Sequence, residues 1–165
     1  MLKHVHDLYG DEIDTTDWAI TQGSNNNDVS ASFGTQAGGG AVDLSVLSRD
    51  TYQVLTNQVN PLLYALRIAG FAAWLRGYGE LGKDSPIHIH TIVIGDQKLS
   101  EAAQEQLNGI AGYFRGYGGL LVDGSPTIDR FGGPVIRQWM FDLSYRHLHE
   151  YLNPSTRESL TVNLS

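Results

Sequence analysis

The chain has 165 residues and a formal net charge of −7, with 11 Lys and Arg, 18 Asp and Glu and no Cys. This length suits one domain, or one domain with a tail, and allows a core that needs no cross-links. The lack of Cys excludes disulfides, thiolate metal sites and Cys nucleophiles. The acidic balance and the scattered basic residues argue against nucleic acid and anionic membranes as partners, because both attract clustered cations.

The beginning of the chain does not read as a targeting signal. Residues 1–16 are polar and acidic, and they lack the apolar core and the small-residue cleavage site of a signal peptide. No window approaches the roughly 18 consecutive apolar residues of a membrane span. We therefore expect a flexible arm over residues 1–16 and a protein made in the cytoplasm without membrane insertion. Action outside the cytoplasm would require release or delivery to the cell wall by another system.

The first expected strands flank a long loop. Residues 17–21 suit a short strand, and the Gly-, Asn- and Ser-rich stretch that follows is typical of a functional loop. Residues 41–46 alternate between apolar and small or polar side chains, which predicts a strand with one face in the core. Asp43 would lie on the opposite face.

A long helix and two further strands are expected next. Ser48 suits the N-cap of a helix that ends at Gly70, with a kink or a break near Pro61. Residues 71–76 and 88–94 read as strands.

The last part of the chain reads as helices separated by loops. Ser100 suits the N-cap of a helix that runs to about Phe114, and residues 116–133 are rich in loop formers. Residues 135–152 read as a last helix, so residues 125–165 would form a helical extension able to contact a protein partner. This order of elements favours an α+β fold with an antiparallel sheet and flanking helices.

Histidines occur as repeated His-x-His pairs. The three pairs are His4 and His6, His88 and His90, and His147 and His149. On a strand, both imidazoles of such a pair point to one side, about 7 Å apart. On a helix they point about 200° apart and cannot share a ligand. Only the second pair lies in an expected strand, so it is the candidate for metal binding or catalysis.

Asp43 follows three consecutive glycines. A lone Asp in this place could cap a turn or pair with Arg49, and Gly38, Gly39 and Gly40 could form a simple hinge. Glycines also allow the backbone to approach a ligand or a neighbouring strand closely. The residues alone leave these alternatives open.

The two segments together resemble a known family. GTQAGGGAVDLS, residues 34–45, resembles the first zinc motif of the D-Ala-D-Ala metallopeptidase class, His-x-x-Gly-x-Ala-x-Asp, with Gly39, Ala41 and Asp43 in place. HIHT, residues 88–91, resembles the second motif. That class shares its fold with hedgehog-type domains and its zinc site with lysostaphin-type enzymes. The likeness covers about residues 17–120, which implies a D,D-peptidase-like domain over residues 17–124.

The resemblance implies zinc-dependent hydrolysis of peptide bonds in peptidoglycan stem peptides of bacterial cell walls. Asp43 and His90 would hold one zinc ion, and His88 would assist proton transfer or stabilise the oxyanion. Arg76 is the candidate for holding a substrate carboxylate, with Trp74 as a second substrate-binding residue. A surface salt bridge is the alternative for Arg76.

Gln36 stands where the family has the first zinc-ligand histidine. An amide oxygen is a weak, hard ligand that suits Ca²⁺ or Mg²⁺ better than Zn²⁺. Gln36 could be a natural loss or a deliberate inactivating change, or His4 or His6 could supply the third ligand instead. The alternative to an enzyme is a binding or assembly module that keeps the peptidase scaffold without its chemistry.

Overall fold

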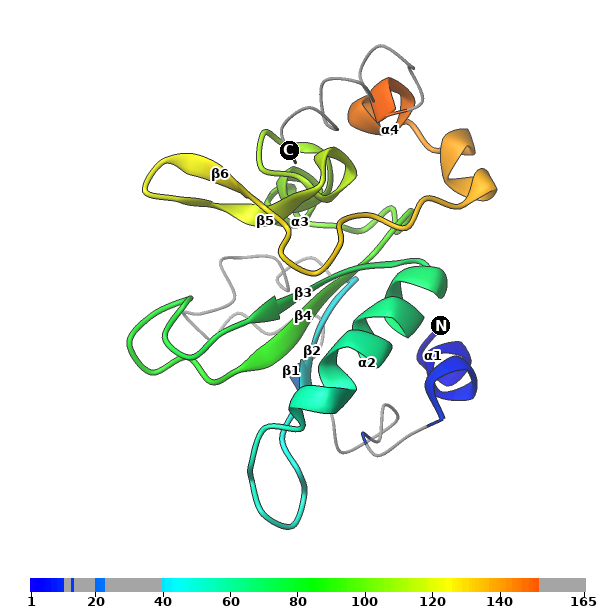
Figure 1. Cartoon of the computed structure of the whole chain (residues 1–165). Coiled ribbons are helices and arrows are strands. Elements are labelled where there is room, and N and C mark those ends of the chain that lie inside the picture. Colours follow the sequence, from blue (N-terminus) through cyan, green and yellow to red (C-terminus); the bar gives the residue numbers. More distant parts are fainter. Residues whose placement is uncertain (11–12, 14–19, 23–39, 152–165) are drawn as a thin grey trace, which may run out of the picture. The chain divides into compact units, whose positions relative to one another are not determined.

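The structure is a computed structural model that describes residues 1–10, 13, 20–22 and 40–151 (Figure 1). The chain divides into two compact units, Met1–Gln104 and Glu105–Ser165. This division falls earlier in the chain than the boundary expected after residue 124. The two units are considered separately.

The first unit contains most of the sheet-forming segments. Its elements are α1 (Leu2–Tyr9), β1 (Ile20–Gln22), β2 (Ala41–Ser45), α2 (Thr56–Ile68), β3 (Phe71–Arg76), β4 (His88–Val93) and the start of α3 (Glu101–Asn108). The four strands form one sheet in the order β1-β2-β4-β3, and every neighbouring pair is antiparallel. The predicted α+β class with an antiparallel sheet and helices is therefore confirmed.

The register of β2, β4 and β3 gives the sheet two chemically different faces. Residues directly opposite each other on neighbouring strands share a face, and so do residues two apart on one strand. One face carries Leu44, Ile89 and Leu75 in a single row. The other, which we call the site face, carries two rows: Asp43, His90 and Trp74, then Ser45, His88 and Arg76.

Helix α2 supplies the apolar layer of this unit. It packs along β3 and buries one apolar stripe: Val59, Leu62, Leu63 and Leu66. The guanidinium of Arg67 ties the helix to the sheet, because its NH2 group donates to the carbonyl oxygen of Ala73 at 2.8 Å. The helix ends at Ile68 with Ala69 as its C-cap, and Gly70 follows as the predicted stop.

The start of α2 differs from the prediction. The helix begins at Thr56 and not after Ser48, because Leu47 pairs with Val54 in an isolated β-bridge that closes a turn between them. Pro61 lies inside α2 without dividing it into two helices.

The expected flexible arm contains a helix. Residues Leu2–Tyr9 form α1, which packs against α2 with Val5 fully buried. The Tyr9 hydroxyl donates to Oε1 of the buried Gln58 at 2.6 Å. Val5 and the Tyr9–Gln58 hydrogen bond thus help to hold a segment whose composition is mostly polar.

The second unit contains a hairpin where a loop was predicted. Strands β5 (Tyr117–Val122) and β6 (Ser125–Ile128) are joined by Asp123 and Gly124, both with positive φ. An Asp-Gly pair in a two-residue connection is a typical hairpin turn. This Asp-Gly signal was present in the sequence, but the glycines around it led to the prediction of a loop.

The helices of the second unit are shorter than predicted. Helix α3 ends at Asn108 and not near Phe114, and Gly109 follows it. Residues 135–152 do not form one helix: a 3-10 helix, Gln138–Asp142, precedes α4 (Arg146–Tyr151). The single long helix expected here is therefore wrong, and the contact of this stretch with a protein partner stays a prediction.

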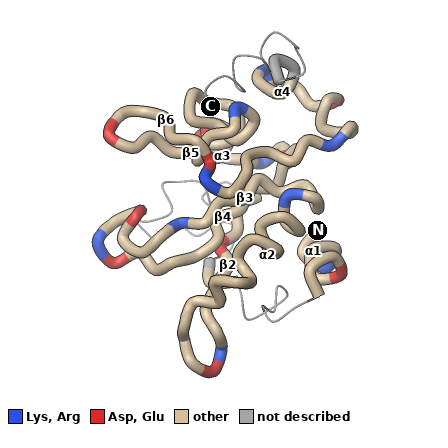
Figure 2. The backbone as a smooth tube through the Cα atoms, in the orientation of Figure 1, with Lys and Arg blue, Asp and Glu red and all other residues tan. Residues whose placement is uncertain are grey.

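Charged groups are dispersed over the described elements. Figure 2 shows Lys and Arg on separate helices, strands and loops, with acidic residues among them. In the described part of the chain, none of the helices has both the length and the apolar character needed to cross a membrane.

Candidate functional site

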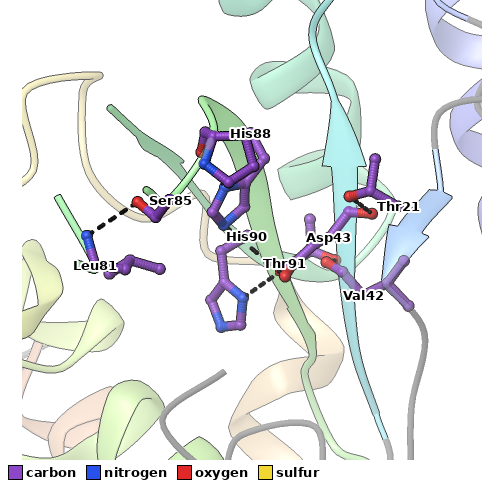
Figure 3. Close-up of polar contacts among 9 residues, drawn as sticks. Thr21, Val42, Asp43, Leu81, Ser85, His88, His90 and Thr91 are labelled. Carbon is purple, nitrogen blue, oxygen red and sulfur yellow. Dashed lines mark hydrogen bonds and ion pairs between the residues drawn. The ribbon is translucent and has the colours of Figure 1, made fainter. Parts of the chain in front are cut away.

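Asp43 and His90 face each other across β2 and β4, 47 positions apart in the sequence. His90 Nδ1 lies 2.7 Å from Asp43 Oδ1 (Figure 3). Both residues are almost completely buried, with exposed fractions of 7% for Asp43 and 5% for His90. The antiparallel pairing of two central strands therefore brings the two predicted ligand residues together.

The contact with Asp43 determines the state of the His90 ring. A carboxylate oxygen only accepts, so Nδ1 carries the proton that is shared with Asp43. Burial lowers the pKa of His90 most strongly, while the hydrogen bond and charge of Asp43 raise it in part and the neighbouring Arg76 and His88 lower it further. The net lowering favours a neutral ring with its lone pair on Nε2. That nitrogen is buried and has no hydrogen-bond partner among the described residues.

His88 is held in the same tautomer by a different partner. Its Nδ1 lies 2.8 Å from the carbonyl oxygen of Pro86, which can only accept, so this nitrogen is the donor. A neutral His88 ring thus has its lone pair on Nε2. This atom is buried, lies 3.9 Å from Asp43 Oδ2 and has no hydrogen-bond partner in the part of the chain that the structure describes.

Trp74 and Arg76 extend the two rows of the site face. The Trp74 indole stacks on the His90 ring, with centroids 6.1 Å apart and an interplanar angle of 15°. The Arg76 guanidinium lies over the Trp74 ring, 5.3 Å from its centroid. The exposed fractions are 2% for Trp74 and 3% for Arg76. These residues were predicted to bind substrate; both side chains are buried in this structure, and that role stays a prediction.

Two further residues of the site were not predicted from the sequence. Glu80 Oε1 lies 3.5 Å from Arg76 NH1, and the Pro86 carbonyl orients His88. Glu80 follows Arg76 by four residues within a Gly-rich loop, and this spacing was the available signal. The Pro86 contact involves only the backbone, so its residue type carried no signal.

Short polar side chains tie down the strands that carry the site (Figure 3). The Thr91 hydroxyl donates to the carbonyl oxygen of Val42 at 2.7 Å, and the Thr21 hydroxyl donates to that of Asp43 at 3.3 Å. These bonds link β4 and β1 to β2 on either side of Asp43. They help to keep the carboxylate opposite His90.

The donor types at the site fit a zinc ion, although the described residues provide an incomplete set. Carboxylate oxygen and imidazole nitrogen are zinc ligands, and a catalytic site normally uses three protein ligands. Among the described residues, no group of three or more His, Asp or Glu is arranged to hold a metal. Gln36, the predicted position of the missing histidine, lies outside the described residues. His4 and His6 lie exposed on α1 and form part of no such group.

The chain matches no protein-family model, and neither a curated protein nor a solved structure was found to match it. Its function therefore has to be inferred from the site. A buried carboxylate beside two imidazoles whose Nε2 atoms have no hydrogen-bond partner among the described residues can take up a divalent cation or transfer a proton.

Proposed function

We propose that this chain is a zinc-dependent, D,D-peptidase-like protein that acts on peptidoglycan stem peptides of bacterial cell walls, with the hedgehog-type fold that this class shares. One observation supports this function above the others. Asp43 and His90, the positions selected by the two motif resemblances, meet at 2.7 Å with His88 beside them.

Asp43 and His90 would hold the ion. An imidazole nitrogen binds zinc only when it carries no proton, so uptake of the ion at Nδ1 would replace the proton that this nitrogen shares with Asp43 Oδ1. When bound, zinc would polarise the scissile carbonyl and favour the deprotonation of water.

The remaining residues have roles in proton transfer and positioning. His88, whose Nδ1 is held by the Pro86 carbonyl, would accept a proton on Nε2 from the attacking water and return it to the leaving amine. Asp43 and Trp74 fix the orientation of His90. Arg76 would supply the positive charge for a substrate carboxylate.

Zinc content tests this function directly. We expect Gln36→His to raise zinc affinity by more than the roughly 10- to 100-fold effect of an outer-shell change, because it restores a strong first-shell ligand. Asp43→Ala and His90→Ala should abolish zinc binding in that background, whereas His88→Ala should leave it nearly unchanged. His6→Ala, which removes an exposed imidazole from α1, is the matched control and also tests the arm as a source of the third ligand.

Hydrolysis of the proposed substrate is the second test. Wild type and Gln36→His are incubated with muropeptides that contain D-amino acids, and the products are identified by mass spectrometry. Cleavage by Gln36→His that is lost in His88→Ala would support the peptidase. If no variant binds zinc and no muropeptide is cleaved, the metal-free binding or assembly module becomes the better assignment.

A further inference from the structure

The loop between β3 and β4 returns an acidic side chain to the edge of the site face. Arg76 and His88 are opposite each other where this loop begins and ends. Glu80, within the loop, places Oε1 3.5 Å from Arg76 NH1 and accepts the backbone N–H of Gly77 through Oε2 at 2.7 Å. A carboxylate of the chain itself therefore lies at the guanidinium that is the candidate for binding a substrate carboxylate.

The two members of this ion pair differ in their access to water. The side chain of Arg76 is 3% exposed, while that of Glu80 is 34% exposed. Of the two, the Glu80 carboxylate is the one that exchanges contacts with solvent. A soluble anion that approaches the Arg76 NH1 group from this side competes with it.

The loop does not depend on the ion pair for its shape. Gly79 N donates to the Ser85 carbonyl at 2.9 Å, Ser85 N donates to the Gly82 carbonyl at 2.9 Å, and Leu81 N donates to the Ser85 hydroxyl at 3.3 Å. These bonds fold the loop on itself. The Glu80 side chain can thus turn towards water without unfolding the backbone that carries it.

The geometry of the contact also favours exchange. Arg–carboxylate hydrogen bonds are strongest at about 2.7–2.9 Å and in a bidentate arrangement, and the Arg76–Glu80 separation of 3.5 Å is longer. An unpaired charge in the interior is unfavourable, so the replacement of one carboxylate by another is easier than simple loss of Glu80. Two carboxylates held at one guanidinium would repel each other.

We propose that Glu80 is a specificity-determining residue: it occupies Arg76 in the ligand-free protein and is displaced by ligands that carry a free carboxylate. The inference rests on the assignment of Arg76 under the proposed function. Because His88 is the cross-strand neighbour of Arg76, a peptide held by its terminal carboxylate places its last residues beside His88. A ligand without that carboxylate cannot replace Glu80.

The test compares the binding of a carboxylic acid and of its amide to wild type and to two variants that each remove one negative charge. N-acetyl-D-alanine and N-acetyl-D-alaninamide are titrated into wild type, Glu80→Gln and Asp84→Asn, with the indole N–H signal of Trp74 followed by NMR. Asp84 is an exposed acid of the same loop, so both variants change the net charge equally. We expect Glu80→Gln to bind the acid about three- to tenfold more tightly than wild type, because the competing ion pair is lost. The affinity of Glu80→Gln for the amide should not increase, and Asp84→Asn should bind both ligands as wild type does.

The inference is overturned if Glu80→Gln raises the affinity for the acid and for the amide equally. It is also overturned if Asp84→Asn raises the affinity for the acid as much as Glu80→Gln does, or if Glu80→Gln does not bind the acid. Adding Arg76→Gln to Glu80→Gln should remove the preference for the acid, and a preference that survives would also overturn it. The binding assay needs neither zinc nor turnover. A protein that selects the acid without hydrolysing muropeptides would therefore refute the proposed function and leave this inference in place.

Discussion

The Trp74 indole and the His90 imidazole lie nearly parallel, 6.1 Å apart, while Asp43 contacts the same imidazole at 2.7 Å. The three residues are consecutive cross-strand neighbours on β3, β4 and β2. The indole restricts the plane of the ring, and the carboxylate restricts its rotation within that plane. Among the described residues, the orientation of His90 thus follows from the sheet register.

Removal of the stacking partner should loosen His90. We expect Trp74→Ala to reduce the free energy of unfolding by about 3–5 kcal/mol, because it empties a large buried volume, and to broaden or shift the imidazole ¹⁵N signals of His90. Trp74→Phe keeps an aromatic face and should preserve those signals with a smaller loss of stability. Urea unfolding and long-range ¹H–¹⁵N spectra measure the two effects. Unchanged His90 signals in Trp74→Ala would show that the stack does not position the ring.

The hydrogen bond from His90 to Asp43 can be tested in metal-free protein. Asp43→Ala leaves a buried Nδ1–H without an acceptor, so we expect a loss of about 1–3 kcal/mol in unfolding free energy. Asp43→Asn keeps an acceptor oxygen and should cost less, with the proton of His90 still on Nδ1. Urea unfolding gives the stability and ¹⁵N shifts give the tautomer. A proton on Nε2 in wild type would contradict the arrangement described above.

Local signals predicted some elements and failed for others because pairing with distant residues decides their meaning. Ser48 and Ser100 both accept a backbone N–H three residues later, at 3.3 and 3.2 Å. At Ser100 the bond caps α3, whereas at Ser48 it belongs to a turn, since Leu47 pairs with Val54 and Tyr52 has a φ of 55°. The sequence contains the capping residue in both cases. The capping residue alone does not reveal that Leu47 and Val54 pair across the turn.

Some features of the site could likewise be predicted from the sequence, and others could not. The strands β2 and β4 and the meeting of Asp43 with His90 could be predicted, because alternation fixes which side chains share a face and the two motifs single out the residues. The contact of Glu80 with Arg76 depends on how the loop between β3 and β4 folds back, and the Pro86 contact uses a carbonyl group that every residue type possesses. Gly38 and Gly39 lie outside the described residues, so their predicted role stays a prediction.

Gly40 is the described glycine that allows β2 to begin where it does. It has a φ of 75°, and a Cβ added there would lie 2.5 Å from Leu99 Cδ2 and 2.8 Å from Asp96 Oδ2. Its carbonyl also accepts the Val93 N–H at 2.7 Å, which links the start of β2 to the end of β4. A side chain at this point would face both a disfavoured backbone conformation and a lack of space.

The substitution Gly40→Ala should therefore lower the unfolding free energy by more than the cost of the left-handed backbone conformation alone. Gly10→Ala is the matched control, because Gly10 has a φ of 59° and nothing within 4 Å of an added Cβ. We expect Gly10→Ala to cost about 1–2 kcal/mol of unfolding free energy from the left-handed conformation, and Gly40→Ala to cost about 1–3 kcal/mol more from overpacking. Urea unfolding of the full chain measures both. Equal losses would mean that Leu99 and Asp96 move aside freely, and that β2 does not need a glycine three residues before Asp43.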